Sequence, residues 1–470
     1  MSRLSLVTIR AHAKAASAIL VALTITVAVT FSVLSALSLG GASKAAIVLL
    51  LAMGLMLGVL ALTRFGVFVI LTLILRSSLD LFKLSGPRAG IAEASVASRA
   101  LDPSSVLATL FVLVASLWLV SQYRRTRRLP GSSLRRALLV FLSACSLSIV
   151  GSGAPGASTV EAMRIASVVL MFVVLEQIAG DTARMRQVLL AVYLSAVPPL
   201  TFTAYGLLTG NPRLELKSGF RRILGTFHQS NSFGRYLMLL IVMGVALYPY
   251  IERRWRRPLA MILAGCSVCL LLTYALSAFI GAVLGLLVVG FLQSKRMIIG
   301  LLVAVGVAFL FSPSLSVRFS KVVDSMGNDP NARSSLDWRL DYWADVLPLA
   351  NTNVITGIGL AQTQYNTNQA KQPHNDFVRA YVEAGVIGFI AYLYLILTLV
   401  AMGSKAIAVV SKATLDRGVV VGFCGCLTSF VAVSIVANVF SNVAVLWYFF
   451  AFAALTSAAV RRQNNPPQHL

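Results

Sequence analysis

Side chains suited to anion binding and to acid–base chemistry gather in two polar stretches of this chain. They are Arg221, Arg222, His228 and Asn231 in the first stretch, and Arg339, Tyr342, Trp343, His374 and Asn375 in the second. Guanidinium groups stay charged at physiological pH and form paired hydrogen bonds to phosphate oxygens, each worth roughly 1.5–3 kcal/mol. An imidazole with a pKa near neutrality can take a proton from an attacking hydroxyl, which typically raises a rate by about 100- to 10,000-fold. The residue types therefore indicate a site for a phosphorylated substrate and a hydroxyl.

Aromatic and acidic residues of the second stretch leave alternatives open. Tyr342 and Trp343 can stack on sugar rings or anchor the loop at a membrane interface. Asp337, Asp341 and Asp345 recur every fourth residue, which favours a solvated helix face over a metal site. The five cysteines all fall in apolar runs. We therefore expect no bound metal, no cofactor and no disulfide.

The composition indicates what kind of protein positions these side chains. The chain has 470 residues, of which 58% are hydrophobic and 12% are charged. One water-soluble core of ordinary proportions cannot bury that much apolar surface, so we expect an integral membrane protein. The formal net charge of +24 comes from short Lys and Arg clusters between apolar runs. This pattern is typical of membrane orientation and not of nucleic-acid binding.

Apolar runs recur along the whole chain. A membrane helix needs about 20 residues, and fewer inside a bundle, which predicts about 12–14 spans here. We expect an all-α, polytopic transmembrane helix bundle in which 1–470 form a single membrane domain. The expected spans are 17–40, 45–63, 65–82, 104–121, 137–153, 162–180, 187–207, 234–251, 258–275, 277–293, 297–313, 382–403, 418–438 and 443–460.

Basic connections predict the orientation, because Lys and Arg resist translocation. The N-terminal segment is basic, and every second connection after it is basic as well. We therefore expect a multi-pass protein of the cytoplasmic (inner) membrane with both termini in the cytoplasm. Three outer-face loops are then long enough to build a site: 83–103, 208–233 and 314–381. The first carries little chemistry and is expected to connect two spans.

Short motifs follow one another between residues 210 and 400. They are Arg222-x-x-Gly225-x-Phe227 with Asn231, Arg339-x-x-Tyr342-Trp343, Gly357-x-Gly359, His374-Asn375-x-Phe377 and Glu383-x-Gly385-x-x-Gly388. Their order, spacing and expected side of the membrane together resemble the O-antigen ligase and polymerase superfamily. The resemblance implies a GT-C-like, metal-independent membrane glycosyltransferase that moves a glycan from undecaprenyl diphosphate to an acceptor, with inversion at the anomeric carbon. We expect the glycines of Gly357-x-Gly359 to serve a turn with positive φ.

The resemblance also implies roles for individual residues. Arg222, in the outer loop 208–233, and Arg339, in the loop 314–381, would bind the donor diphosphate, and His374 would assist the acceptor hydroxyl. Relatives more often have small or polar residues where this chain has His228, so His228 competes with His374 as the base. Glu383 is a candidate cap for the span that begins there. The expected substrate-binding residues are Arg221, His228, Asn231, Tyr342, Trp343, Asn375 and Glu383.

Several functions remain open at this point. The favoured one is an O-antigen or exopolysaccharide polymerase, and the alternatives are an O-antigen ligase with a lipid-core acceptor and a protein O-oligosaccharyltransferase. A transporter or flippase of lipid-linked glycans would need polar residues within the spans, where they are scarce. The expected partners are the undecaprenyl-diphosphate glycan, a saccharide or lipid-core acceptor, and the bilayer. A flippase and a chain-length regulator are candidate protein partners.

Overall fold

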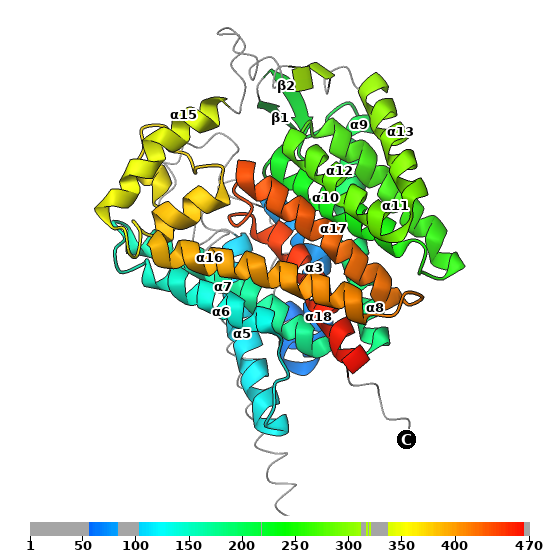
Figure 1. The fold of residues 1–470 in the computed structure, drawn as a ribbon, viewed down its shortest axis with the longest axis horizontal. Helices are drawn as coiled ribbons and strands as arrows, with labels where there is room; N and C mark the ends of the chain where they lie inside the picture. Colours follow the sequence, from blue (N-terminus) through cyan, green and yellow to red (C-terminus); the bar gives the residue numbers. More distant parts are fainter. Residues whose placement is uncertain are drawn as a thin grey trace, which may run out of the picture.

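The computed structural model describes residues 56–82, 103–217, 219–311, 316–317, 319–320 and 337–464, and most of them are helical. The elements in chain order are α3 (Phe65–Arg76), η1 (Leu79–Phe82), α5 (Pro103–Thr126), α6 (Ser133–Leu147), α7 (Pro155–Ile178), α8 (Thr182–Leu194), α9 (Val197–Leu208), β1 (Leu214–Lys217), β2 (Phe220–Ile223), α10 (Ser230–Leu247), α11 (Arg253–Leu272), α12 (Leu276–Gln293), α13 (Lys295–Phe311), α15 (Asp337–Val346), η2 (Leu347–Thr352), η3 (Thr363–Tyr365), α16 (Asp376–Val409), α17 (Leu415–Val436) and α18 (Val443–Asn464). Figure 1 shows the helices packed into one bundle. The expected span 17–40, most of 45–63, nearly all of the loop 83–103 and much of 314–336 lie outside the described residues.

Nine helices of the described part of the chain are long and apolar enough to cross a membrane, with α8 and α9 together forming one span, Thr182–Leu208. This confirms the predicted all-α transmembrane bundle. Three expected spans correspond to shorter helices, α3, α6 and α13. Helix α3 ends at Arg76, where the chain turns into η1 and the Arg76 guanidinium forms a buried ion pair with Asp80 at 3.5 Å.

Helix α18 forms the centre of the bundle, since nearly all of its residues are buried. Its Trp447 packs against Phe111 of α5 with ring centroids 5.0 Å apart, and its Phe449 stacks on Phe430 of α17 at 4.4 Å. Helices α5, α11 and α12 are apolar, and only 28–33% of their spans is buried inside the bundle. Such helices are expected to face lipid, so they form the outer layer of the bundle.

Ion pairs join the basic connections to neighbouring helices at one end of the bundle. Arg135, between α5 and α6, pairs with Glu176 near the end of α7 at 2.7 Å. Arg462, at the end of α18, pairs with Asp416 at the start of α17, also at 2.7 Å. The charge pattern predicted one side for these connections, and the two ion pairs agree with that prediction for the connections that they join. That this side is cytoplasmic stays a prediction.

The other end collects the loops that were expected on the outer face. Ser158, in the first turn of α7, donates to the carbonyl of Leu360 at 2.8 Å. The backbone amide of Asn375 donates to Oδ1 of Asn438, between α17 and α18, at 3.2 Å. The hairpin of β1 and β2 and helix α15 both lie along the upper edge of the bundle in Figure 1. The candidate loops therefore share one end of the molecule.

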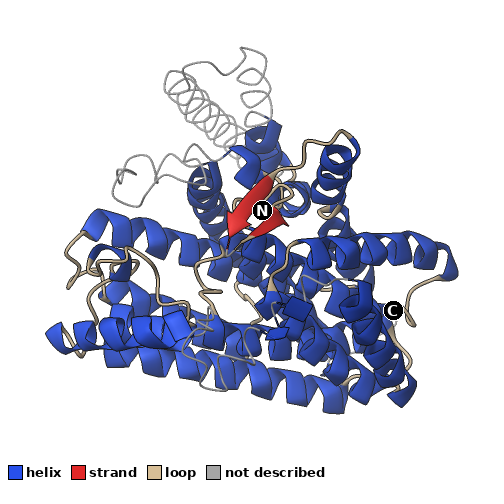
Figure 2. Ribbon diagram, turned by 90° about the horizontal axis from the view of Figure 1, so that it is seen from above, coloured by secondary structure: helices blue, strands red, loops and turns tan. Residues whose placement is uncertain are grey.

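The outer loop 208–233 contains a two-stranded antiparallel sheet, which the all-α prediction missed (Figure 2). Glu215 of β1 pairs with Arg222 of β2 in the register. Gly219 precedes β2 with a φ of +79°, which glycine adopts without strain. Ser230, the first residue of α10, donates from its amide and its hydroxyl to Glu215 Oε2 at 3.1 and 2.7 Å. This contact docks the hairpin on α10 and positions Arg222.

Helix α16 is broken at Gly385, whose φ of +67° and ψ of −168° are not helical. The segment 354–359 lies along the break. It forms hydrogen bonds with backbone amides and carbonyls that have no partner within the helix at the break. Two of its amides donate to the carbonyls of Val382 and Glu383, and two of its carbonyls accept from the first amides after the break. Both glycines of the Gly357-x-Gly359 motif have positive φ, as predicted.

We expect the substitution Gly385→Ala to unfold this junction. A Cβ there would lie 2.2 Å from a backbone carbonyl oxygen of the apposed segment, and positive φ adds strain of about 1–3 kcal/mol. The thermal midpoint of the purified protein, followed by circular dichroism, should fall by several degrees. The control is Gly300→Ala in α13, where a Cβ meets nothing within 4 Å. Equal midpoints for the two variants would contradict this account of the break.

Candidate active site

Helix α15 anchors the loop that carries His374. Tyr342 donates to the carbonyl of Lys371 at 2.5 Å, and Trp343 Nε1 donates to the carbonyl of Pro373 at 2.6 Å. Both bonds fix the segment immediately before His374. Tyr342 is fully buried, so its ring is not available to stack on a sugar. The structure thus gives both residues a positioning role, and substrate contact by the partly exposed Trp343 stays a prediction.

His374 and Asn375 form the entry to α16. The Asn375 side chain accepts hydrogen bonds from the backbone amides two and three residues later, at 2.9 and 3.2 Å, and so caps the helix. His374 has a φ of +55°, an uncommon conformation for a residue with a side chain. The helix begins at Asp376, so the expectation that Glu383 caps it is wrong. Asn375 therefore orients the residue before it.

Basic side chains from several segments form one group of electrostatically interacting cations that includes the neighbours of His374. They are Lys217 of β1, Arg222 of β2, Arg235 of α10, Arg339 of α15 and Lys371 of the loop before α16. Four of them act electrostatically on His374, and Arg222 acts on Lys217. Arg222 and Arg235 are only 2% and 5% exposed. Buried guanidinium groups beside further cations make a site that favours a multiply charged anion.

The environment of His374 makes it a weak base. Burial, followed by the positive charges of the surrounding arginines and lysines, lowers its pKa to about 3. The expected pKa near neutrality is therefore wrong for the protein alone. Burial and neighbouring cations also lower the pKa of Lys217. An anion among these cations would cancel part of their field and raise both pKa values again.

Trp338 of α15 supports the imidazole and one of its cationic neighbours. Its ring meets His374 edge to face with centroids 5.6 Å apart, and it stacks on Tyr342 at 5.2 Å. The Lys371 ammonium lies 4.5 Å from the centroid of the same ring, where the electron-rich face attracts a cation. Trp338 therefore orients both groups, through contacts that the spacing of the motif did not reveal.

A buried ion network lies behind the loop and connects α16 to α7. Arg379 donates from Nε to Glu383 at 2.8 Å and from Nη2 to Glu161 of α7 at 2.9 Å. Glu383 also accepts from the amide of Ala361 at 2.8 Å and from the hydroxyl of Thr363 at 2.9 Å. Its carboxylate is 1% exposed and is used inside the protein. Glu383 therefore positions the loop, in contrast to the expected substrate contact.

Three further predicted residues lie at the hairpin side of the cations. Arg221 is exposed and neighbours Arg222 along β2, so the two side chains point to opposite faces. His228 and Asn231 are half-buried just before and within the first turn of α10. Their part in substrate binding stays a prediction. In the described ranges, no three His, Cys, Asp or Glu side chains are grouped to bind a metal ion.

The sequence analysis did not assign Lys217, Arg235, Lys371 or Trp338 to the site. Arg235 carried a usable signal, because an ionisable residue just inside an apolar span often serves function. Lys217 ends an alternating run followed by Ser-Gly, which indicates a hairpin. The other two come close to His374 only through the folding of the long loop.

Comparison with known protein families found a match. Residues 259–393 match the family model described as O-antigen ligase. Over this region, which is less than a third of the chain, the sequence is similar to that family, and the match supports the resemblance to the O-antigen ligase and polymerase superfamily. The matched region begins in α11, ends in α16 and includes Arg339 and His374, whereas Arg222 and Arg235 precede it. A search of curated proteins found no match.

The ionisation of His374 can be measured directly. In the protein alone the imidazole should stay neutral down to pH 5, because its pKa lies near about 3. Adding inorganic diphosphate should raise the pKa towards its ordinary value, whereas sodium chloride at equal ionic strength should raise it less. The measurement is nitrogen NMR of labelled histidine, assigned with His374→Gln. Titration near pH 6.5 without any response to diphosphate would contradict the proposed electrostatics.

Proposed function

We propose that this protein transfers a glycan from an undecaprenyl-diphosphate donor to a saccharide hydroxyl at the outer face of the cytoplasmic membrane. The superfamily match supports glycan transfer in general. The observation that supports the more specific proposal is the electrostatic interaction of His374 with Arg339 and Lys217, and of Lys217 with Arg222.

In this proposal the cations bind the donor. Guanidinium forks match the geometry of phosphate oxygens and form paired, charge-assisted hydrogen bonds with them. Arg222 and Arg339 bind the two phosphates, and Arg235 and Lys217 neutralise the remaining charge. The hairpin that carries Lys217 and Arg222 docks on the first turn of the apolar helix α10, which also carries Arg235, so a polyprenyl chain attached to the diphosphate can remain in the lipid.

The transfer step needs a nucleophile, a leaving group and a proton acceptor. The acceptor hydroxyl attacks the anomeric carbon from the face opposite the diphosphate, and the bond from that carbon to the diphosphate oxygen breaks. Undecaprenyl diphosphate leaves with the electron pair, and the arginines stabilise its charge. The hydroxyl proton passes to His374. Because the donor's negative charge raises the pKa of His374, the imidazole becomes an effective base when the donor is bound.

We propose a polymerase, in which the acceptor is another lipid-linked repeat unit of an O-antigen or exopolysaccharide. A ligase would use the same donor site with a lipid-core sugar or a protein hydroxyl. The two reactions differ in the acceptor, and an acceptor assay therefore separates them.

Substitutions at His374 and Arg339 test the assignment of roles. His374→Ala should lower glycan transfer by about 100- to 10,000-fold, because it removes the proton acceptor. Arg339→Lys keeps the charge but loses the guanidinium fork, so transfer should fall by about 10- to 100-fold. The assay is transfer from a defined undecaprenyl-diphosphate oligosaccharide by purified protein in liposomes.

Two further variants serve as comparisons in the same assay. Arg125→Lys, at the basic end of α5, should keep full activity, because it lies far from the cations. His228→Ala should retain more activity than His374→Ala. If His228→Ala were inactive and His374→Ala active, the base would be His228. Full activity in Arg339→Lys would exclude paired phosphate recognition by that residue.

Reconstitution with different acceptors tests the reaction class. With the lipid-linked repeat unit alone, the products should lengthen into a ladder of glycans. Addition of a lipid-core oligosaccharide should leave that ladder in place. Transfer only to the lipid core would identify a ligase, and movement of the lipid-linked glycan across the bilayer without a new glycosidic bond would contradict the enzymatic proposal.

A further inference from the structure

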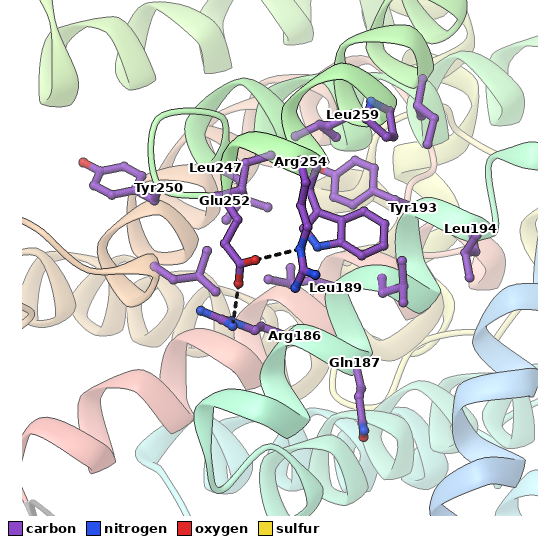
Figure 3. Close-up of a pocket in the computed structure, with 16 residues that line it drawn as sticks. Arg186, Gln187, Leu189, Tyr193, Leu194, Leu247, Tyr250, Glu252, Arg254 and Leu259 are labelled. Atoms are coloured by element: carbon purple, nitrogen blue, oxygen red, sulfur yellow. Dashed lines mark hydrogen bonds and ion pairs between the residues drawn. The ribbon is translucent and has the colours of Figure 1, made fainter.

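A concave site lies at the basic end of the bundle, at the opposite ends of the helices from His374. It has a cavity volume of about 380 Å³ and is lined by α8, by the turn between α10 and α11, and by α11 (Figure 3). This volume falls in the range of small-molecule pockets, roughly 300–1,000 Å³. The site shares no residue with the candidate active site.

The walls of this pocket are apolar. Leu189 and Leu190 of α8 line it, as do Leu259 and Ile262 of α11. Leu190 is 44% exposed, and most of α11 is exposed as well, so the pocket opens towards the surface that faces lipid. Walls of this kind lack the hydrogen-bonding groups that a polar ligand or a peptide backbone would require.

The rim of the pocket carries an excess of positive charge. Glu252 pairs with both Arg186 at 3.0 Å and Arg254 at 2.8 Å, so a single carboxylate serves two guanidinium groups. Arg186 and Arg254 remain 58% and 73% exposed. Two more exposed arginines, Arg253 and Arg257, stand in the same first turns of α11.

The position of the rim matches the water–lipid interface. Trp255 lines the pocket and is 46% exposed, and tryptophan is enriched at the level of lipid headgroups. Arginine at this level attracts anionic headgroups, while its aliphatic stem packs on apolar surface. Apolar walls below a cationic rim are thus arranged in the same order as the two ends of a phospholipid.

We propose that this pocket binds an anionic phospholipid of the leaflet at the basic end, with an acyl chain between α8 and α11 and the phosphate at Arg186 and Arg254. The charge excess of the rim selects an anionic headgroup over a zwitterionic one. Glu252 limits the affinity, because it competes with the phosphate for the same two guanidinium groups.

Lipid titration tests this site on the delipidated, full-length protein. Native mass spectrometry should show tighter binding of phosphatidylglycerol than of phosphatidylcholine. Arg254→Glu should weaken phosphatidylglycerol binding by about tenfold, in line with the loss of a charge-assisted hydrogen bond. Glu252→Gln should strengthen it, which is a change that a merely damaged pocket would not produce.

Matched variants separate the pocket from general lipid contact. Leu190→Trp fills the pocket and should weaken binding, whereas Met261→Trp, at a 75% exposed position of α11 outside the pocket lining, should not. Arg125→Glu, at the end of α5, serves as the charge control. Equal binding of the two lipids, or equal effects of Leu190→Trp and Met261→Trp, would overturn the proposal.

A photoreactive residue in place of Ile262 identifies the occupant in native membranes. The mass of the adduct should correspond to a phospholipid with an anionic headgroup. An adduct to a peptide of this chain, or to a zwitterionic lipid, would overturn the proposal.

Discussion

The guanidinium group of Arg379 is bonded inside the protein by segments that lie far apart in the sequence. It donates to Glu383 on its own helix, to Glu161 on α7 and to Ser441 between α17 and α18. Removing buried charges from water is costly, and the cost is offset only when the partners are in place. The network therefore holds the first turns of α16 in one position. His374 lies immediately before those turns, so its position depends on this buried network.

The cations around His374 present the opposite case, because their arrangement opposes stability and suits function. The positive charges near the buried Arg222 and Arg235 repel one another, and this repulsion disfavours the folded state. In the proposed function, a diphosphate anion would remove that repulsion and at the same time restore basicity to the imidazole. The same arrangement would then couple donor binding to proton transfer from the acceptor hydroxyl.

The parts of the fold that depend on periodic composition could be predicted from the sequence. The spans followed from apolar runs, and the pairing of Arg135 with Glu176 agrees with the alternation of basic connections. The hairpin of β1 and β2 was missed because four-residue strands are too short for a periodic signal to outweigh their helical context. The roles of Tyr342 and Glu383 were missed because residue type does not reveal burial. Both residues look suited to a ligand, yet each is bonded to loop atoms that are distant in the sequence.

The central claim is that Arg222 and Arg339 bind the same diphosphate beside His374. An experimental structure of the protein with a polyprenyl-diphosphate oligosaccharide in a lipid nanodisc tests it most directly. We expect phosphate density between β2 and α15, with the anomeric carbon facing the imidazole of His374. Phosphate density at another end of the bundle, or bound to only one of the two arginines with His374 directed away, would contradict it.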